Sequence, residues 1–205
     1  MSKDIREQIN KFKNWKPFLK EEIGGNVKDG VNFVYNQHPE LSSIGTPEQY
    51  SQYLNTIFPN SKVKDIVYHG SRSKEIEGGK LRSSSEGTYG EGIYVQTKQE
   101  FTGTFGSNTL FLMIDTKKPF NFYKENGKAN DFFTEILEKW RKTKKSYFAE
   151  AAKEEFQDEI KKVGFDSIKT EEGDDNLYYI LFNPEQTHIL GIKNDIQAFQ
   201  NFLNK

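Results

Sequence analysis

Apolar residues recur at helical spacing in the first third of this chain, and each such stretch stops at proline or glycine. Residues 4–23 carry an apolar face that ends near Pro17, and residues 27–35 fit a second short helix. The clearest start signal is Thr-Pro-Glu-Gln at 46–49: an N-cap residue, a proline at the first helical position and a capping-box glutamine. We therefore expect a helix that begins after Thr46 and stops before Pro59, packed under the first strand.

Three further helices are predicted by stripes of apolar residues three or four positions apart. The first stripe is Phe132, Phe133, Ile136, Leu137 and Trp140, the second is Phe148, Ala152, Phe156, Ile160 and Val163, and the third is Ile196, Phe199 and Leu203. Asn194 or Asp195 is expected to cap the last of these helices.

Short runs of β-branched and aromatic residues predict strands at 66–71, 93–97, 109–115, 164–168, 178–182 and 187–192. The third run is expected to end before Pro119. These strands come before, between and after the helices, without regular alternation of strand and helix. The pattern therefore predicts an α+β fold with mostly antiparallel strand pairing.

Composition bounds this picture without changing it. At 205 residues the chain suits one domain with a proper core, and aromatic residues (14%) offset a low hydrophobic content of 34%. Charge is balanced, with 29 basic and 30 acidic residues, so nothing draws the whole chain towards nucleic acid or an anionic membrane. A local patch would still suffice for a nucleic-acid target.

The absence of cysteine excludes disulfides, thiolate nucleophiles and cysteine-ligated zinc. The histidines His38, His69 and His188 lack metal-ligand spacing, so we expect no metal, and we expect His38 and His188 to be structural or surface residues. No apolar run approaches the roughly 20 residues that span a bilayer, and the N-terminus lacks a signal-peptide core. We expect a soluble cytoplasmic protein, although export that needs no signal peptide would leave no trace.

The residues with chemical potential begin at His69, which follows a predicted strand and precedes Gly70, Ser71 and Arg72. Taken alone, a histidine at the end of a strand is more often structural than catalytic. A glycine beside it lets a ligand amide approach bare backbone, which offers both a donor and an acceptor.

A second motif is Gly-Glu-Gly-Ile-Tyr at 90–94. A tyrosine between isoleucine and valine is ordinarily a core residue. Eleven positions after Tyr94, however, comes a second aromatic residue, Phe105, and a hydroxyl residue, Thr102, lies three positions before it. In this order and at these offsets the motifs resemble the NAD-binding core of ADP-ribosyltransferases, on the diphtheria-toxin and poly(ADP-ribose) polymerase side of that superfamily. Residues 53–70 are also similar to the segment before the histidine motif in transferase domains of phage polyvalent proteins.

The resemblance implies a split antiparallel β-sandwich around an NAD cleft, flanked by helices, with NAD as substrate and no metal. His69 would bind a ribose hydroxyl, the Gly70 backbone would hold the nicotinamide carboxamide, and Tyr94 and Phe105 would form the walls of the nicotinamide slot. The cofactor-binding residues implied in this way are His69, Gly70, Ser71, Arg72, Tyr94, Thr102 and Phe105.

The third motif departs from the family. The run Tyr-Tyr-Ile-Leu-Phe-Asn-Pro-Glu-Gln at 178–186 matches the family's last core strand, and it puts Tyr178 where the family carries a glutamate. Tyrosine can hydrogen-bond a ribose but offers no negative charge. Some mono-ADP-ribosylating members also have a non-acidic residue there, so the catalytic set would read His69, Tyr94 and Tyr178. Alternatively a nearby acid returns to the cleft; the candidates are Glu171, Glu172, Asp174, Asp175 and Glu185.

The resemblance therefore implies a monomeric mono-ADP-ribosyltransferase, a toxin or effector of phage or bacterial origin. Its acceptor would be a macromolecule, protein rather than nucleic acid, and no membrane is involved. Two alternatives stay open: an NAD glycohydrolase toxin, and a binding module for NAD or ADP-ribose that lost catalysis together with the glutamate. We expect an N-terminal helical extension at 1–45 and a catalytic domain at 46–205 with a helical insert at 129–162.

Overall fold

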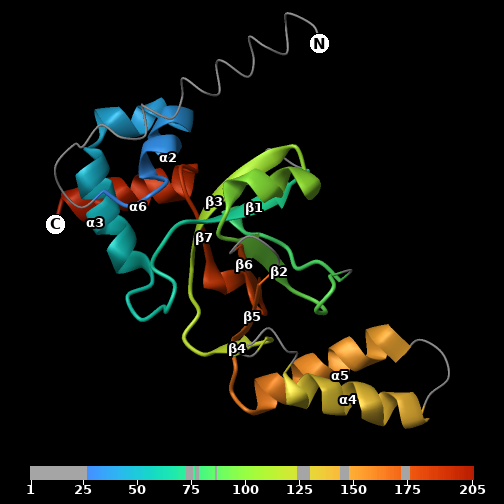
Figure 1. Ribbon diagram of the computed structural model, residues 1–205. Coiled ribbons are helices and arrows are strands. Elements are labelled where there is room, and N and C mark those ends of the chain that lie inside the picture. Colours follow the sequence, from blue (N-terminus) through green and yellow to red (C-terminus); the bar gives the residue numbers. More distant parts are fainter. Residues whose placement is uncertain are drawn as a thin grey trace, which may run out of the picture.

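The computed structural model describes residues 27–72, 76, 79–85, 87–123, 130–143, 148–171 and 176–205. Within these ranges the chain forms a seven-stranded sheet with helices at both ends of the molecule (Figure 1). The helix expected at 4–23 lies outside the described residues, as do the side chains of Leu137, Trp140, Phe148 and Ala152.

The helices are α2 (Val31–Gln37), α3 (Pro47–Ile57), α4 (Asp131–Thr143), α5 (Phe148–Lys162) and α6 (Lys193–Leu203). Three short 3₁₀ helices are η2 (Pro39–Ser43), η4 (Gln99–Thr104) and η5 (Pro184–Gln186). The strands are β1 (Val67–Ser71), β2 (Ile93–Gln96), β3 (Asn108–Ile114), β4 (Pro119–Asn121), β5 (Ser167–Glu171), β6 (Leu177–Leu181) and β7 (Thr187–Ile189).

The start of α3 follows from its local sequence. Gln49 N donates to Thr46 Oγ1 at 3.3 Å, and Thr46 N donates to Gln49 Oε1 at 2.9 Å, so the predicted capping box is confirmed. Pro47 stands at the first helical position, where its missing N–H has no partner to lose.

Several strand boundaries differ from the prediction; β7, for example, ends at Ile189 rather than at 192. Two of the differences have a clear physical reason. Gly164, with φ 87°, ends α5: its N–H donates to Lys161 O, and Phe165 N donates to Ile160 O. The next strand, β5, therefore begins only at Ser167. Val163, which was predicted to belong to the apolar stripe of α5, is 59% exposed. Pro119 does not end the preceding strand, since β3 already stops at Ile114; it is the first residue of the edge strand β4, a position where proline costs no ladder hydrogen bond.

The strand order is β4-β5-β6-β2-β1-β3-β7, and every adjacent pair is antiparallel except β4 with β5. At the centre, β1 and β2 share a single register pair, Tyr68 with Gln96. The two predicted sheets are therefore two halves of one sheet, β1-β3-β7 and β2-β6-β5-β4, that separate beyond this pair. The α+β class and the mostly antiparallel pairing are confirmed.

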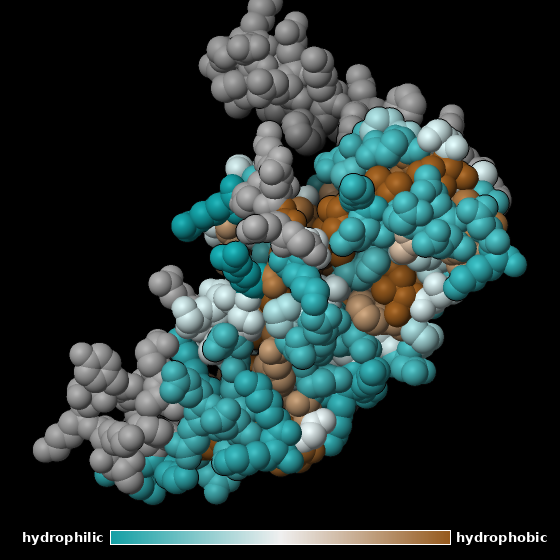
Figure 2. Space-filling view, turned by 180° about the vertical axis from the view of Figure 1, so that it is seen from behind, coloured by the Kyte–Doolittle hydropathy of each residue, from teal (hydrophilic) through white to brown (hydrophobic). Residues whose placement is uncertain are grey.

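Three hydrophobic clusters hold the layers of helices and strands together. The first lies between α2, α3 and α6 and the strands β1 and β3, around Leu54, Phe111 and Phe199. The second joins the two half-sheets through side chains such as Val67, Val95, Leu112 and Leu181. The third packs α4 and α5 against the other half; its members include Phe120, Ile136, Phe156, Ile168 and Ile180. Seen from behind, hydrophilic residues dominate the outer surface of the α4–α5 hairpin (Figure 2).

Asp195 is fully buried. The prediction that Asn194 or Asp195 caps α6 is wrong, because the N-cap residue is Ile192. The Asp195 carboxylate instead accepts hydrogen bonds from the hydroxyls of Tyr50 and Tyr53, from His188 Nε2 at 2.6 Å and from Gly191 N at 2.7 Å. This cluster ties α6 to α3 and to β7.

Gln186 joins three segments of the sheet through its side-chain amide. Its Oε1 accepts from Phe182 N and Asn183 N, both at 3.0 Å, and its Nε2 donates to Asp115 O at 2.8 Å and Asp166 O at 3.0 Å. One amide side chain thereby links the end of β6 to the end of β3 and the start of β5, across both half-sheets.

No helix among the residues described here is long and apolar enough to cross a membrane.

Candidate functional site

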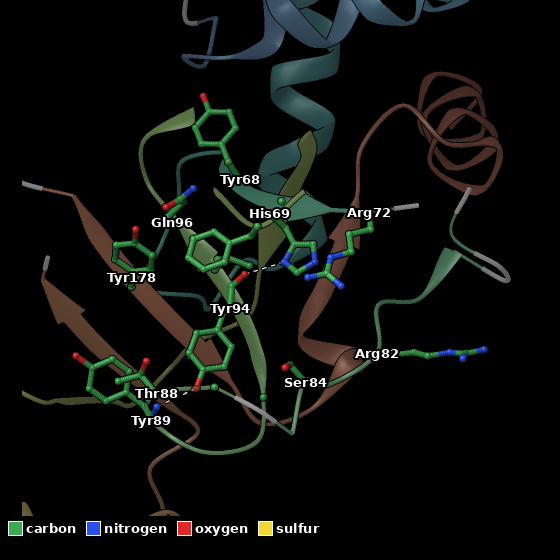
Figure 3. A pocket seen from close by; sticks show the side chains of 15 residues that line it. Tyr68, His69, Arg72, Arg82, Ser84, Thr88, Tyr89, Tyr94, Gln96 and Tyr178 are labelled. Atoms are coloured by element: carbon green, nitrogen blue, oxygen red, sulfur yellow. Dashed lines mark hydrogen bonds between the residues drawn. The ribbon is translucent and has the colours of Figure 1, made fainter. Parts of the chain in front are cut away.

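A cavity of about 480 Å³ opens where the two half-sheets separate. Six of the residues predicted from the sequence line it together: His69, Gly70, Arg72, Tyr94, Phe105 and Tyr178 (Figure 3). They come from β1, β2, β6 and the turn after η4, so the cavity exists only once the two half-sheets have joined. Ser71 and Thr102 are not part of its lining.

His69 bridges the two half-sheets. Its Nδ1 lies 2.7 Å from the carbonyl oxygen of Tyr94 (Figure 3), and because a carbonyl only accepts, Nδ1 carries the proton. Burial lowers the pKa of His69 below its ordinary 6.5, outweighing the opposite effect of this hydrogen bond, so the ring is neutral at pH 7. Nε2 therefore keeps a lone pair that is able to accept a hydrogen bond.

Gly70 is a glycine because η4 packs directly on it. A Cβ at this position would clash with the Thr102 carbonyl and lie 2.9 Å from Phe105 Cβ. The space beside Gly70, which was predicted to admit a ligand, is thus occupied by η4 of the protein itself. This packing brings Phe105, whose side chain is 52% exposed, over the strand that carries His69.

Thr102 is buried and turned away from the cavity. Its hydroxyl donates to Gln99 O at 2.7 Å and lies 2.6 Å from Thr109 Oγ1. These contacts hold η4 against β3, and a direct contact of Thr102 with the cofactor stays a prediction. The same is true of Ser71, whose carbonyl accepts from Asn108 Nδ2 at 3.4 Å.

Tyr94 is fixed by the loop that precedes its strand. Its hydroxyl donates to Gly90 O at 2.7 Å and accepts from Tyr89 N at 3.0 Å. Gly87 touches the ring so closely that any Cβ there would overlap it. The orientation of the aromatic ring is therefore set by backbone atoms of residues 87–90.

Tyr178, Gln96 and Tyr68 stand side by side across three strands, since Gln96 pairs with Tyr178 on β6 and with Tyr68 on β1 (Figure 3). Gln96 is 2% exposed, and its Oε1 accepts from Asn176 Nδ2 at 3.4 Å. Its Nε2 has no hydrogen-bond partner within the described part of the chain. Sequence reasoning missed Gln96, although strand alternation places it on the same face as Tyr94.

Two of the acids proposed as substitutes for Tyr178 lie in the described part of the chain, and neither lines the cavity. Glu171 is exposed at the end of β5, and Glu185 pairs with Lys80 on the surface. Glu172, Asp174 and Asp175 lie outside the described residues. Among the described residues, no carboxylate lines the cavity, whereas Tyr178 does.

Two arginines, Arg72 and Arg82, line the cavity (Figure 3). Arg82 has no motif of its own. It is brought in by an isolated bridge in which Ser84 N donates to Gly92 O at 2.8 Å and Gly92 N donates to Ser84 O at 3.0 Å. Guanidinium groups such as these are suited to binding an anionic group such as a diphosphate. In the ranges that the structure describes, no group of three or more His, Cys, Asp or Glu side chains is arranged to hold a metal.

The α+β fold with its seam cavity and the order of the motifs are those of an ADP-ribosyltransferase. The family model for ADP-ribosyltransferases in polyvalent proteins matches residues 64–196, well over half of the chain, and the protein belongs to that family. Members of the family use NAD as substrate, and the chain is accordingly an ADP-ribosyltransferase domain.

Other comparisons add little. The curated proteins include no match to this chain. A crystal structure of an anti-CRISPR protein aligns over 61% of this chain and 93% of its own, with 13% sequence identity and a TM-score of 0.37. A similarity of this size carries no argument about fold or function.

Proposed function

We propose that this protein transfers a single ADP-ribose from NAD to a macromolecular acceptor, a protein rather than a nucleic acid, and releases nicotinamide. The observation that carries the proposal is the convergence of His69, Tyr94, Phe105 and Tyr178 on one cavity from separate segments. The balanced charge of the chain supports the choice of acceptor. A toxin or effector of a phage or bacterium, active as a monomer, fits this activity.

The proposed reaction breaks the bond between the nicotinamide nitrogen and C1′ of its ribose. Nicotinamide leaves with the electron pair, and a nucleophile of the acceptor bonds to C1′ and releases its proton. His69 Nε2 would accept a hydrogen bond from a ribose hydroxyl, the ring of Tyr94 would face the nicotinamide opposite Phe105, and the arginines would hold the diphosphate.

Single transfer follows from the third position. Tyr178 offers a hydroxyl but no negative charge, so it cannot activate the hydroxyl of a bound ADP-ribose as the next acceptor. The cationic transition state must then be stabilised by the cavity's dipoles and by a carboxylate that the acceptor supplies. The same feature favours a second candidate function, hydrolysis of NAD, in which water takes the place of the acceptor.

Labelled NAD incubated with the protein and a bacterial lysate, followed by separation of protein from RNA, tests the proposal. One labelled ADP-ribose per modified site on protein supports it, and free ADP-ribose without labelled macromolecule supports the hydrolase. Long polymers would refute single transfer. Intact NAD and no label would favour a binding module without catalysis.

Replacing Tyr94 by alanine is expected to weaken NAD binding at least tenfold, because loss of base–aromatic stacking costs about 1–3 kcal/mol. Calorimetry with a non-hydrolysable NAD analogue measures this directly. Tyr94→Phe keeps the ring and removes only the hydrogen bonds to Tyr89 and Gly90, so its smaller expected loss of affinity separates the orientation of the ring from the stacking itself. Equal affinity of the wild type and Tyr94→Ala would show that nicotinamide does not bind against this ring.

Replacing Tyr178 by phenylalanine is expected to lower the rate of transfer only modestly, by about 1 kcal/mol or roughly fivefold, because one hydrogen bond is lost while the ring still fills its space. Single-turnover transfer from labelled NAD is the appropriate measurement. A loss above a hundredfold would mean that the hydroxyl takes part in the chemical step and that the expectation is wrong.

A further inference from the structure

The loop at residues 87–91, which fixes the hydroxyl of Tyr94, is itself held by elements outside the two motifs. The ring of Tyr89 packs edge-on against Phe122, with ring centroids 4.8 Å apart at 70°. The hydroxyl of Tyr89 accepts a hydrogen bond from Thr170 Oγ1 at 3.3 Å. These contacts anchor the Tyr89 side chain but leave the loop backbone to other partners.

The backbone is held by Gln157, which projects from α5 of the helical insert. Gln157 is only 3% exposed, and its Nε2 donates to Tyr89 O and to Glu91 O, both at 2.9 Å. Both protons of the amide nitrogen are therefore used on the loop, one on each side of Gly90.

Gly90 shows how closely the two parts fit. Its φ of 96° lies in the left-handed region, and a Cβ there would come within 2.7 Å of Gln157 Nε2. The first glycine of the Gly-x-Gly-Ile-Tyr motif thus leaves room for the amide of Gln157.

We propose that Gln157 is a positioning residue for the NAD cavity. Gln157 holds the carbonyls on either side of Gly90, the loop holds the hydroxyl of Tyr94 through Tyr89 N and Gly90 O, and the ring of Tyr94 is thereby fixed as a wall of the cavity. The identity of the ligand rests on the proposed function; the coupling of α5 to Tyr94 does not. The helical insert is then part of the substrate site as well as of the core.

Hydrogen exchange of the backbone amides at 87–96 tests the coupling without any ligand. Gln157→Met keeps the length and bulk of the side chain and removes both donors. We expect the Tyr89 amide, which is bonded to Tyr94, to exchange about tenfold faster or more in Gln157→Met than in the wild type. Asp158→Asn, an exposed change one position along α5, is the control and should exchange like the wild type. Unchanged exchange in Gln157→Met would overturn the proposal whether or not the protein binds NAD.

Kinetics then distinguish positioning from a general loss of stability. Below the unfolding range we expect Gln157→Met to raise the KM for NAD about tenfold while kcat changes less than about threefold. Tyr94→Phe breaks the same chain of contacts, so the two substitutions together should cost little more than the larger one alone. Fully additive effects, or a lowered melting temperature with unchanged KM, would show that Gln157 is merely structural.

If Gln157→Met does not fold, Gln157→Asn replaces it, since this variant keeps an amide but is one methylene too short to reach both carbonyls. It should show the same order of effects at smaller size, and wild-type exchange and KM in this variant would contradict the proposal. A wild-type protein that does not bind NAD would refute the proposed function, while the exchange result would still decide the role of Gln157.

Discussion

His69→Ala is expected to lose nearly all ADP-ribose transfer, about a hundredfold to a thousandfold or more in kcat/KM, as for removal of one preorganised polar group from a catalytic site. The substitution removes two contacts at once. The Nδ1 proton that bridges to Tyr94 O is lost, and so is the Nε2 lone pair available to a ribose hydroxyl. The rate of transfer from labelled NAD is the measurement.

The two contacts can be separated. His69→Asn places an amide N–H near the position of Nδ1, so it should preserve the bridge and the melting temperature but still lack the Nε2 acceptor. We expect it to be as inactive as His69→Ala. His38→Ala, at a histidine outside the cavity, should transfer at the wild-type rate. Activity retained in both His69 variants would remove this residue from the catalytic set.

The protonation state of His69 also gives the reaction a pH dependence with a definite sign. Burial lowers the pKa of His69 in the folded protein below 6.5, and only the neutral ring offers an acceptor at Nε2. The kcat/KM should therefore be level above pH 6.5 and fall as the pH drops through the lowered pKa. The unfolded chain binds this proton more tightly, so the fold also loses stability in the same acidic range. An acid limb centred above pH 6.5 would contradict this reading.

Asp195→Ala should produce the largest loss of stability, about 3–5 kcal/mol, because it leaves the buried hydroxyls of Tyr50 and Tyr53, His188 and Gly191 N without their acceptor. The total free energy of unfolding of a globular domain is about 5–15 kcal/mol, so a loss of this size should lower the melting temperature by about 10 °C. Urea denaturation gives the free energy. Tyr50→Phe removes one of these hydrogen bonds and should cost less than half as much. A loss below about 1 kcal/mol in Asp195→Ala would show that water replaces the carboxylate.

Features fixed by neighbouring residues were predicted well from the sequence. The capping box of α3 depends on four consecutive residues, and the strand that carries His69 is specified by its own β-formers. Asp195 shows the limit of such reasoning. An acid near a helix start reads as a cap, but its hydroxyl partners on α3 are about 140 residues away in sequence, and only the tertiary fold reveals them.

The candidate site divides in the same way. The offset from Tyr94 to Phe105 identified two residues that do line one cavity, while their roles towards NAD stay predictions. Arg82 and Gln157 were missed because an isolated bridge and helix packing bring them in, and neither leaves a local signature. Gln96 could have been found from strand alternation, but its neighbours Tyr178 and Tyr68 are set by strand register. Thr102 has the predicted spacing, yet its hydroxyl is committed to holding η4 in place.

The four hydrogen bonds of Gln186 have a consequence for how a substrate enters. They fasten the end of β3 and the start of β5 to the end of β6, and so they oppose a separation of the two half-sheets. We therefore expect the gap between β1 and β2 to keep its width when a ligand binds. If NAD binds here as proposed, its binding free energy would not be spent on separating the two half-sheets. Selectivity of the cavity for its ligand would then depend on its fixed dimensions. Conformational adjustment on binding would be confined to side chains and loops.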